Sequence, residues 1–199
     1  MCHRVGARER YRGSVRVIAG SSRGRRLPAR LPGSVRPTPD RVREAMFDVL
    51  GAMGGVGGAV VLDLFCGSGA LGLEALSRGA AAVTFVDHDA AALAAVRRNL
   101  EGTGLASPAA SLVRAELPGW LGRAEHADLA MCDPPYAFDD WSTLLGMLDA
   151  DIAVLESREA VELPERWMVT RSRRYGGTLV TVARMSHPRA GRERGGLHA

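Results

Sequence analysis

From Ala59 onward the sequence alternates short apolar runs with longer segments of helical periodicity, which restricts the chain to few folds. The first run, AVVLDLF (59–65), is followed by the helical pattern GALGLEALSRG (69–79). Further apolar runs lie at 81–87, 108–114, 127–133 and 151–157, and further helical patterns at 90–104 and 140–149. A final antiparallel pair is predicted over 167–184, turning at Gly176–Gly177. Such alternation predicts an α/β fold with a mostly parallel, doubly wound sheet.

The segment GSGALG (67–72) follows the first strand and matches G-x-G-x-x-G, the loop that brings a dinucleotide pyrophosphate to a helix N-terminus. Asp63, late in the strand, argues against that ligand. A carboxylate aimed at the ligand crevice would repel a pyrophosphate by about 4 kcal/mol at 4 Å and intermediate dielectric. The ammonium and sulfonium of S-adenosylmethionine would be attracted instead. The loop therefore favours S-adenosylmethionine, with Gly72 packing the helix on the strand.

The second strand ends in Asp87, 24 residues after Asp63. An acid at this position accepts hydrogen bonds from ribose hydroxyls, so it indicates a nucleoside without identifying the rest of the ligand. Asp89 lies nearer the following helix and is expected to cap it. The cofactor-binding residues predicted around these strand ends are Asp63, Phe65, Gly67, Ser68, Gly69, Asp87 and His88.

Asp-Pro-Pro-Tyr (133–136) follows the fourth strand, which neighbours the first strand in a doubly wound sheet. The exocyclic amine of a base is a poor nucleophile because its lone pair is delocalised into the ring. Asp133 and the carbonyl of Pro134 can accept both N–H hydrogens and turn the lone pair toward a methyl group. Pro135 helps to fix the backbone, and Tyr136 offers a stacking face worth about 1–3 kcal/mol. These four residues are the predicted catalytic set, and the base must be unpaired or extruded.

All 26 basic residues are arginines, and they gather at the two ends of the chain. The net charge is +8 over residues 1–50, −9 over 51–156 and +5 over 157–199. An acidic centre between two basic ends indicates an anionic partner, and nucleic acid is the partner we expect.

The N-terminal segment SVRVIAGSSRGRRLPARLP (14–32) predicts a small hairpin. Arg23, Arg25 and Arg26 lie at its tip and are expected to contact phosphates. We expect four parts: a disordered basic arm (1–13), an RNA-binding hairpin (14–36), a methyltransferase domain (37–186) and a disordered tail (187–199).

The three cysteines form no C-x-x-C pair, so neither a metal site nor a disulfide framework is expected. No apolar run approaches the 18 residues of a membrane-spanning helix. The N-terminus lacks the apolar core of a signal peptide, so a cytoplasmic location is expected. We also expect a monomer that does not associate with membranes.

Taken together, RVIAGSSRGRRLP, RPTPDRVREAMFDVL, LDLFCGSGALGLEALSRGA, FVDHD and DPPY resemble the RsmD-type methyltransferases, which modify N2 of a guanine in 16S ribosomal RNA. The resemblance runs from about Val15 to Ala183. It implies a seven-stranded, Rossmann-like class I methyltransferase domain with an N-terminal β-hairpin that grips RNA within small ribosomal subunit particles. It further implies RNA-binding or cofactor-binding positions at Thr38, Arg41, Arg43, Glu116 and Leu117.

Three other functions fit parts of the sequence less well. An N6-adenine methyltransferase acting on DNA or RNA could also use Asp-Pro-Pro-Tyr, although a DNA enzyme of this kind normally carries a separate target-recognition domain. A dehydrogenase is disfavoured by Asp63. A non-catalytic RNA-binding module with a vestigial pocket is disfavoured by the intact tetrapeptide.

Overall fold

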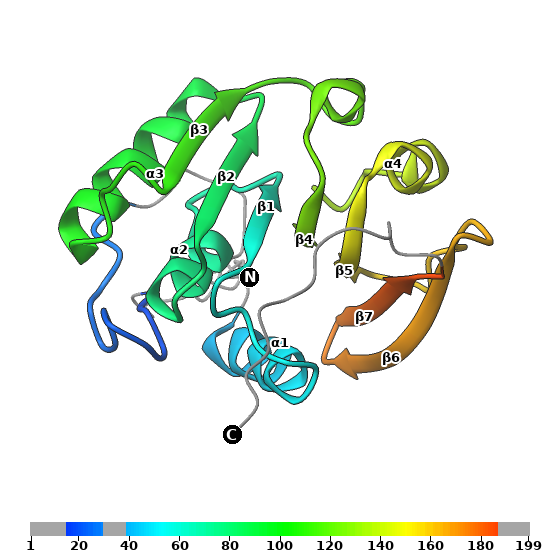
Figure 1. Ribbon diagram of the computed structural model, residues 1–199, viewed down its shortest axis with the longest axis horizontal. Helices are drawn as coiled ribbons and strands as arrows, with labels where there is room; N and C mark the ends of the chain where they lie inside the picture. Colours follow the sequence, from blue (N-terminus) through cyan, green and yellow to red (C-terminus); the bar gives the residue numbers. More distant parts are fainter. Residues whose placement is uncertain (1–14, 30–38, 187–199) are drawn as a thin grey trace, which may run out of the picture.

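The computed structural model describes residues 15–29 and 39–186. The predicted basic arm, the C-terminal tail and Thr38 lie outside these ranges. Within them the chain forms one seven-stranded sheet of order β3-β2-β1-β4-β5-β7-β6, flanked by helices (Figure 1). The predicted α/β class and the seven strands are confirmed.

Strands and helices alternate as expected from the first strand onward. The helices are α1 (Asp40–Ala52), α2 (Ala70–Ser77), α3 (Ala90–Thr103), the 3-10 helix η1 (Gly119–Arg123) and α4 (Trp141–Met147). The strands are β1 (Val60–Leu64), β2 (Ala82–Asp87), β3 (Ala110–Arg114), β4 (Ala127–Cys132), β5 (Ala150–Ser157), β6 (Trp167–Tyr175) and β7 (Thr178–Met185). Strands β1 to β5 run parallel, whereas β7 is antiparallel to both β5 and β6. The predicted final pair, turning at Gly176–Gly177, is confirmed.

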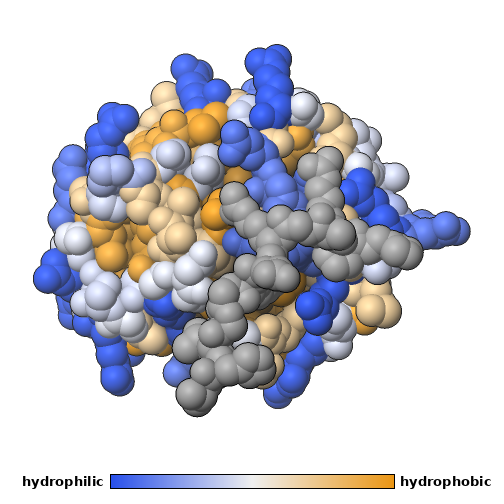
Figure 2. Space-filling model, viewed as in Figure 1, coloured by the Kyte–Doolittle hydropathy of each residue, from blue (hydrophilic) through white to orange (hydrophobic). Residues whose placement is uncertain are grey.

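Two hydrophobic clusters cover the two faces of the sheet, because side chains alternate along each strand. Val61 and Met131 face the cluster that α1, α2 and α3 complete, whereas Leu64 and Cys132 face the cluster that α4 and η1 complete. Hydrophilic side chains project around the rim of the molecule in the view of Figure 2. Among residues 15–29 and 39–186, every helix is too short or too polar to span a bilayer.

The predicted N-terminal hairpin is present as a small antiparallel bridge between Arg16 and Arg26. Its turn is anchored on α2 rather than projecting freely. The buried carboxylate of Glu74 accepts hydrogen bonds from the backbone N–H groups of Ile18 at 2.7 Å and Ala19 at 3.0 Å. These two hydrogen bonds tie the hairpin to α2 and so fix it against the sheet domain.

Candidate active site

A cavity of about 490 Å³ opens at the carboxyl ends of β1, β2, β4 and β5. This is where doubly wound sheets bind ligands. The predicted site residues that line it are Phe65, Gly67, Asp87, His88, Asp133, Pro134, Pro135, Tyr136 and Arg41. Five predicted cofactor residues do not line it: Asp63, Ser68, Gly69, Glu116 and Leu117. The cavity thus joins the glycine loop to the tetrapeptide and leaves out the segment after β3.

Asp87, the last residue of β2, holds the glycine loop in shape. One carboxylate oxygen accepts the Gly67 N–H at 2.9 Å, and the other accepts the Asp89 N–H at 2.9 Å. Gly67 and Gly69 have φ values of 53° and 77°, where a side chain would be strained. Asp89 accepts the Ala91 N–H at 2.8 Å, which confirms its predicted role as the cap of α3.

Asp63 does not point into the cavity, and this corrects the sequence interpretation. Its side chain is buried behind the loop, where one oxygen accepts the Gly72 N–H at 2.9 Å. Burial, with smaller contributions from Asp133 and Asp87, raises the pKa of Asp63 well above its ordinary value, and the Gly72 bond only partly opposes this. Asp63 therefore supports α2 from beneath and does not line the cavity.

Other acids give the cavity its negative charge. Among residues 15–29 and 39–186, four carboxylates line it, those of Asp87, Asp89, Asp133 and Glu156. Two arginines of the same ranges line it, Arg41 and Arg158. An acidic wall favours a cationic ligand over a pyrophosphate. The preference for S-adenosylmethionine over a dinucleotide therefore rests on these four acids and not on Asp63.

Gly72 has the packing role predicted for it. A Cβ at this position would lie 2.3 Å from Cε1 of Phe85 and 2.9 Å from Oδ2 of Asp63. Both neighbours are buried, so neither can move aside cheaply. The glycine lets α2 approach β1 and β2 closely.

The tetrapeptide lies beside the glycine loop because β4 pairs with β1. Cys132 is in register with Leu64, which puts Asp133 next to the end of β1. Pro134 is buried, whereas Tyr136 is 61% exposed. The Arg158 guanidinium carbon lies 4.2 Å from the centre of the Tyr136 ring. One face of the expected stacking platform therefore already holds a cation–π contact.

Two aromatic residues of the cavity wall were not predicted from the sequence. The ring of Phe138 lies 5.1 Å from that of Phe65 and 5.3 Å from that of Trp141, with edge-to-face geometry in both pairs. Phe65 has a φ of 57°, a conformation that non-glycine residues adopt at a cost of about 1–3 kcal/mol and chiefly at functional sites. The only sequence signal was that Phe138 and Trp141 closely follow the tetrapeptide.

Comparison with known proteins shows which family this chain belongs to. The family described as "Conserved hypothetical protein 95" matches residues 15–184. The chain belongs to this family, the RsmD-type methyltransferases.

Two relatives and one solved structure illustrate the match. YlbH of Bacillus subtilis (strain 168) is 38% identical over 184 residues, covering 84% of this chain and 97% of YlbH. The "Ribosomal RNA small subunit methyltransferase D" of Escherichia coli (strain K12) is 34% identical, covering 82% of this chain and 86% of that protein. The structure of yhhF from Escherichia coli superposes with a TM-score of 0.76 at 31% identity, covering 87% of this chain and 98% of that chain.

The arginines that the resemblance and the charge pattern assigned to RNA differ in what they can reach. Arg23 and Arg26 are exposed, and Arg41 lines the cavity. Arg25 is also exposed but donates to the Thr103 carbonyl at 3.0 Å, so it helps to dock the hairpin on α3. Arg43 corrects the expectation: it is fully buried and bonds to the Arg16 carbonyl and to Asp40. A side chain with no exposed surface cannot contact a phosphate, so Arg43 packs α1 against the hairpin.

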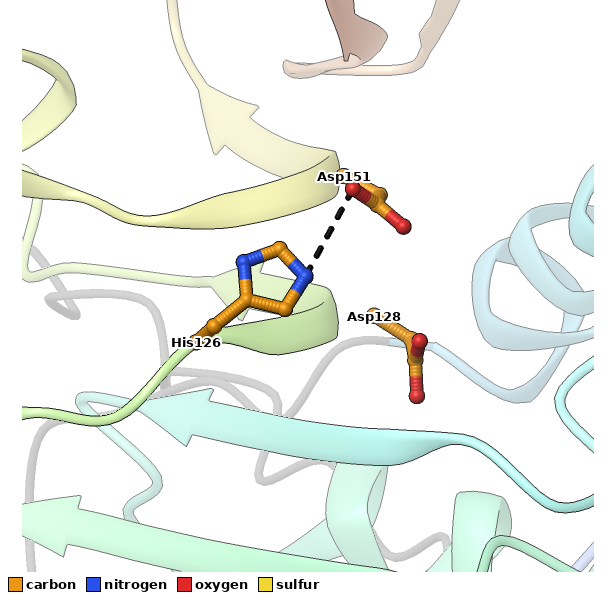
Figure 3. Close-up of side chains that lie close together, drawn as sticks. All are labelled: His126, Asp128 and Asp151. Atoms are coloured by element: carbon orange, nitrogen blue, oxygen red, sulfur yellow. Dashed lines mark ion pairs between the residues drawn. The ribbon is translucent and has the colours of Figure 1, made fainter. Parts of the chain in front are cut away.

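One cluster of metal-ligand residue types lies among the described residues, formed by His126, Asp128 and Asp151 (Figure 3). The His126 ring lies 3.0 Å from Asp149 and 3.5 Å from Asp151. Asp128 accepts the Val60 N–H at 2.7 Å. These residues lie at the start of β4 and β5, opposite the end that bears the cavity, so they take no part in the chemistry of the site.

Proposed function

We propose that this protein transfers a methyl group from S-adenosylmethionine to the exocyclic N2 amine of a guanine in 16S rRNA. The observation that carries the proposal is a cavity lined both by the glycine loop and by Asp-Pro-Pro-Tyr. One element suits a nucleoside cofactor and the other suits an amine-bearing base. The relative named as a small-subunit rRNA methyltransferase supports the choice of substrate.

The residues present fit S-adenosylmethionine. Gly67 lines the cavity without a side chain, and Asp87, already fixed by backbone donors, has lone pairs left for ribose hydroxyls. The four acids of the wall attract its ammonium and sulfonium groups. When bound, the cofactor supplies an electrophilic methyl group.

In the proposed reaction Asp133 and the Pro134 carbonyl accept the two N–H groups of the guanine amine. This draws the nitrogen lone pair out of the ring plane and toward the methyl carbon. A C–N bond forms as the C–S bond breaks, S-adenosylhomocysteine leaves, and one amine proton is released. Asp133 stabilises the positive charge that develops on nitrogen, so catalysis rests on alignment and electrostatics.

RNA is held, in this proposal, by exposed arginines on the hairpin and at the cavity entrance. Arg23 and Arg26 on the hairpin contact phosphates, and Arg41 contacts RNA at the cavity entrance. Tyr136 stacks on the extruded base. The substrate we propose is a small ribosomal subunit particle, with the protein acting as a cytoplasmic monomer.

The test is methylation of small subunits purified from a strain that lacks this gene, using labelled S-adenosylmethionine and nucleoside mass spectrometry. We expect N2-methylguanosine as the product of the wild-type protein. With Asp133→Asn we expect a rate lower by about 100-fold or more, because a neutral amide stabilises the positive charge that develops on the amine nitrogen less than a carboxylate does. Asp139→Asn is the matched control, since Asp139 is exposed and does not line the cavity. N6-methyladenosine as the product, or full activity of Asp133→Asn, would refute the assignment.

A further inference from the structure

One of the four wall acids is buried beside the tetrapeptide, and beyond its contribution to the charge of the cavity it has no contact with the base in the reaction proposed above. Glu156, near the end of β5, is only 6% exposed, yet it lines the same cavity as Asp133. Carboxylates are rarely buried unless they are paired or used. This residue could not be singled out from the sequence, because nothing in AVLES distinguishes a cavity acid from a surface one.

The strand register puts the two acids side by side. Cys132 of β4 is paired in parallel with Leu155 of β5, and both side chains belong to the cluster on the α4 face. Glu156 follows Leu155 within β5 and so faces away from that cluster, whereas Asp133 follows Cys132 directly after the end of β4. Both residues line the cavity. Neighbouring strands lie about 4.8 Å apart. The cavity therefore presents two adjacent carboxylates to whatever base enters it.

Two adjacent acceptors match guanine and not adenine. The Watson–Crick edge of guanine carries the N2 amine and, next to it, the N1–H donor. Adenine presents an acceptor at N1, whose lone pair would face a carboxylate. An ionised carboxylate only accepts hydrogen bonds and has about four lone-pair sites, so it can serve a base in addition to protein groups.

We propose that Glu156 determines base specificity by accepting the N1–H of the target guanine while Asp133 accepts from its N2 amine. This inference rests on the proposed function and deepens it, because it names the residue that selects guanine. Glu156 is a specificity-determining residue and does not act on the methyl group. A site built to hydrogen-bond a donor rejects an analogue lacking it far more strongly than an apolar pocket rejects a size change.

The experiment compares guanosine with 2-aminopurine riboside at the methylated position, within otherwise identical rRNA assembled into small subunits. 2-Aminopurine keeps the C2 amine but has no hydrogen at N1. We expect wild-type kcat/KM to favour guanosine by about 100-fold or more. Glu156→Gln should lower this preference at least tenfold, because an amide can turn its NH₂ toward an N1 acceptor. Glu156→Ala should reduce the preference to within a few fold.

Glu162→Gln is the matched control, since Glu162 is exposed on the segment after β5 and does not line the cavity; it should keep the wild-type preference. Circular dichroism and calorimetric binding of S-adenosylhomocysteine establish that each variant is folded. If Glu156→Ala does not fold, Glu156→Gln carries the test, because glutamine has nearly the same volume as glutamate. The inference would be overturned if the folded Glu156 variants preferred guanosine over 2-aminopurine riboside as strongly as the wild type does, or if the wild type showed no such preference. Either result would leave the proposed function standing. Absence of N2-methylguanosine from the wild-type reaction would overturn the proposed function and this inference with it.

Discussion

The packing of α2 on the sheet yields a sharp stability prediction, for Gly72→Ala. The new Cβ would lie 2.3 Å from Cε1 and 2.8 Å from Cζ of Phe85, against an optimum of about 3.5–4.0 Å for carbon atoms. Phe85 is fully buried in β2, and Asp63 is tied to the Gly72 N–H. Overpacking of this kind costs about 1–3 kcal/mol, whereas replacing a helical glycine gains about 0.5–1 kcal/mol. We therefore expect a net decrease in stability of up to about 2.5 kcal/mol.

Gly51→Ala is the matched control, because Gly51 also lies in a helix, α1, but a Cβ there meets nothing within 4 Å. Only the backbone effect then applies, and we expect stability to rise by about 0.5–1 kcal/mol. Urea unfolding followed by circular dichroism gives both free energies of unfolding, and equal m-values make them comparable. If Gly72→Ala were as stable as Gly51→Ala, the close approach of α2 to Phe85 would be refuted.

Three further predictions concern buried acids, buried thiols and the hairpin. Because folded Asp63 keeps its proton to a higher pH than the unfolded chain does, the contribution of Asp63 to wild-type stability falls as pH rises above about 3.8, the ordinary pKa. Asp63→Asn, which never ionises, should become steadily more stable relative to wild type with rising pH, and a pH-independent difference in urea unfolding would refute this. Burial raises the pKa of both Cys66 and Cys132, so peptide mass spectrometry should show each alkylated by iodoacetamide at least tenfold more slowly at pH 8 than in urea; equal rates would contradict it. The double variant Arg23→Ala/Arg26→Ala should bind small subunits more weakly and with a weaker salt dependence: the slope of log K against log salt concentration should be smaller by about 1 for each phosphate that is no longer bound. The control pair Arg97→Ala/Arg98→Ala, exposed on α3, should change neither the affinity nor this slope.

The order of strands and helices could be predicted from the sequence because it depends on local periodicity. The turn at Gly176–Gly177 and the pairing of β4 with β1 followed from the same pattern together with the general rules for doubly wound sheets. The position of Asp-Pro-Pro-Tyr beside the glycine loop was a consequence of that pairing. These features are robust because each is fixed by a backbone arrangement shared by many sequences.

Burial of single polar side chains could not be predicted in the same way. Arg43 matches a basic motif, and its neighbour Arg41 lines the cavity, but the helical rotation of α1 turns Arg43 under the hairpin. Glu74 lies in an apolar helical pattern, and only the folded chain shows that it accepts two hairpin N–H groups. In both cases the hairpin partner lies at least 27 residues away, at a separation that periodicity does not report.

The contrast between Asp63 and Glu156 shows what decides whether a strand acid reaches the cavity. Each is the last but one residue of its strand, and each is buried. After β1 the loop of residues 65–69 leads into α2, whose Gly72 packs against Asp63, and Asp63 does not line the cavity. After β5 no helix forms before β6 in residues 158–166, all of which the structure describes, and Glu156 lines the cavity although it is only 6% exposed. Strand position fixes the face that an acid occupies, but the connection that follows the strand determines whether that face is open to a ligand.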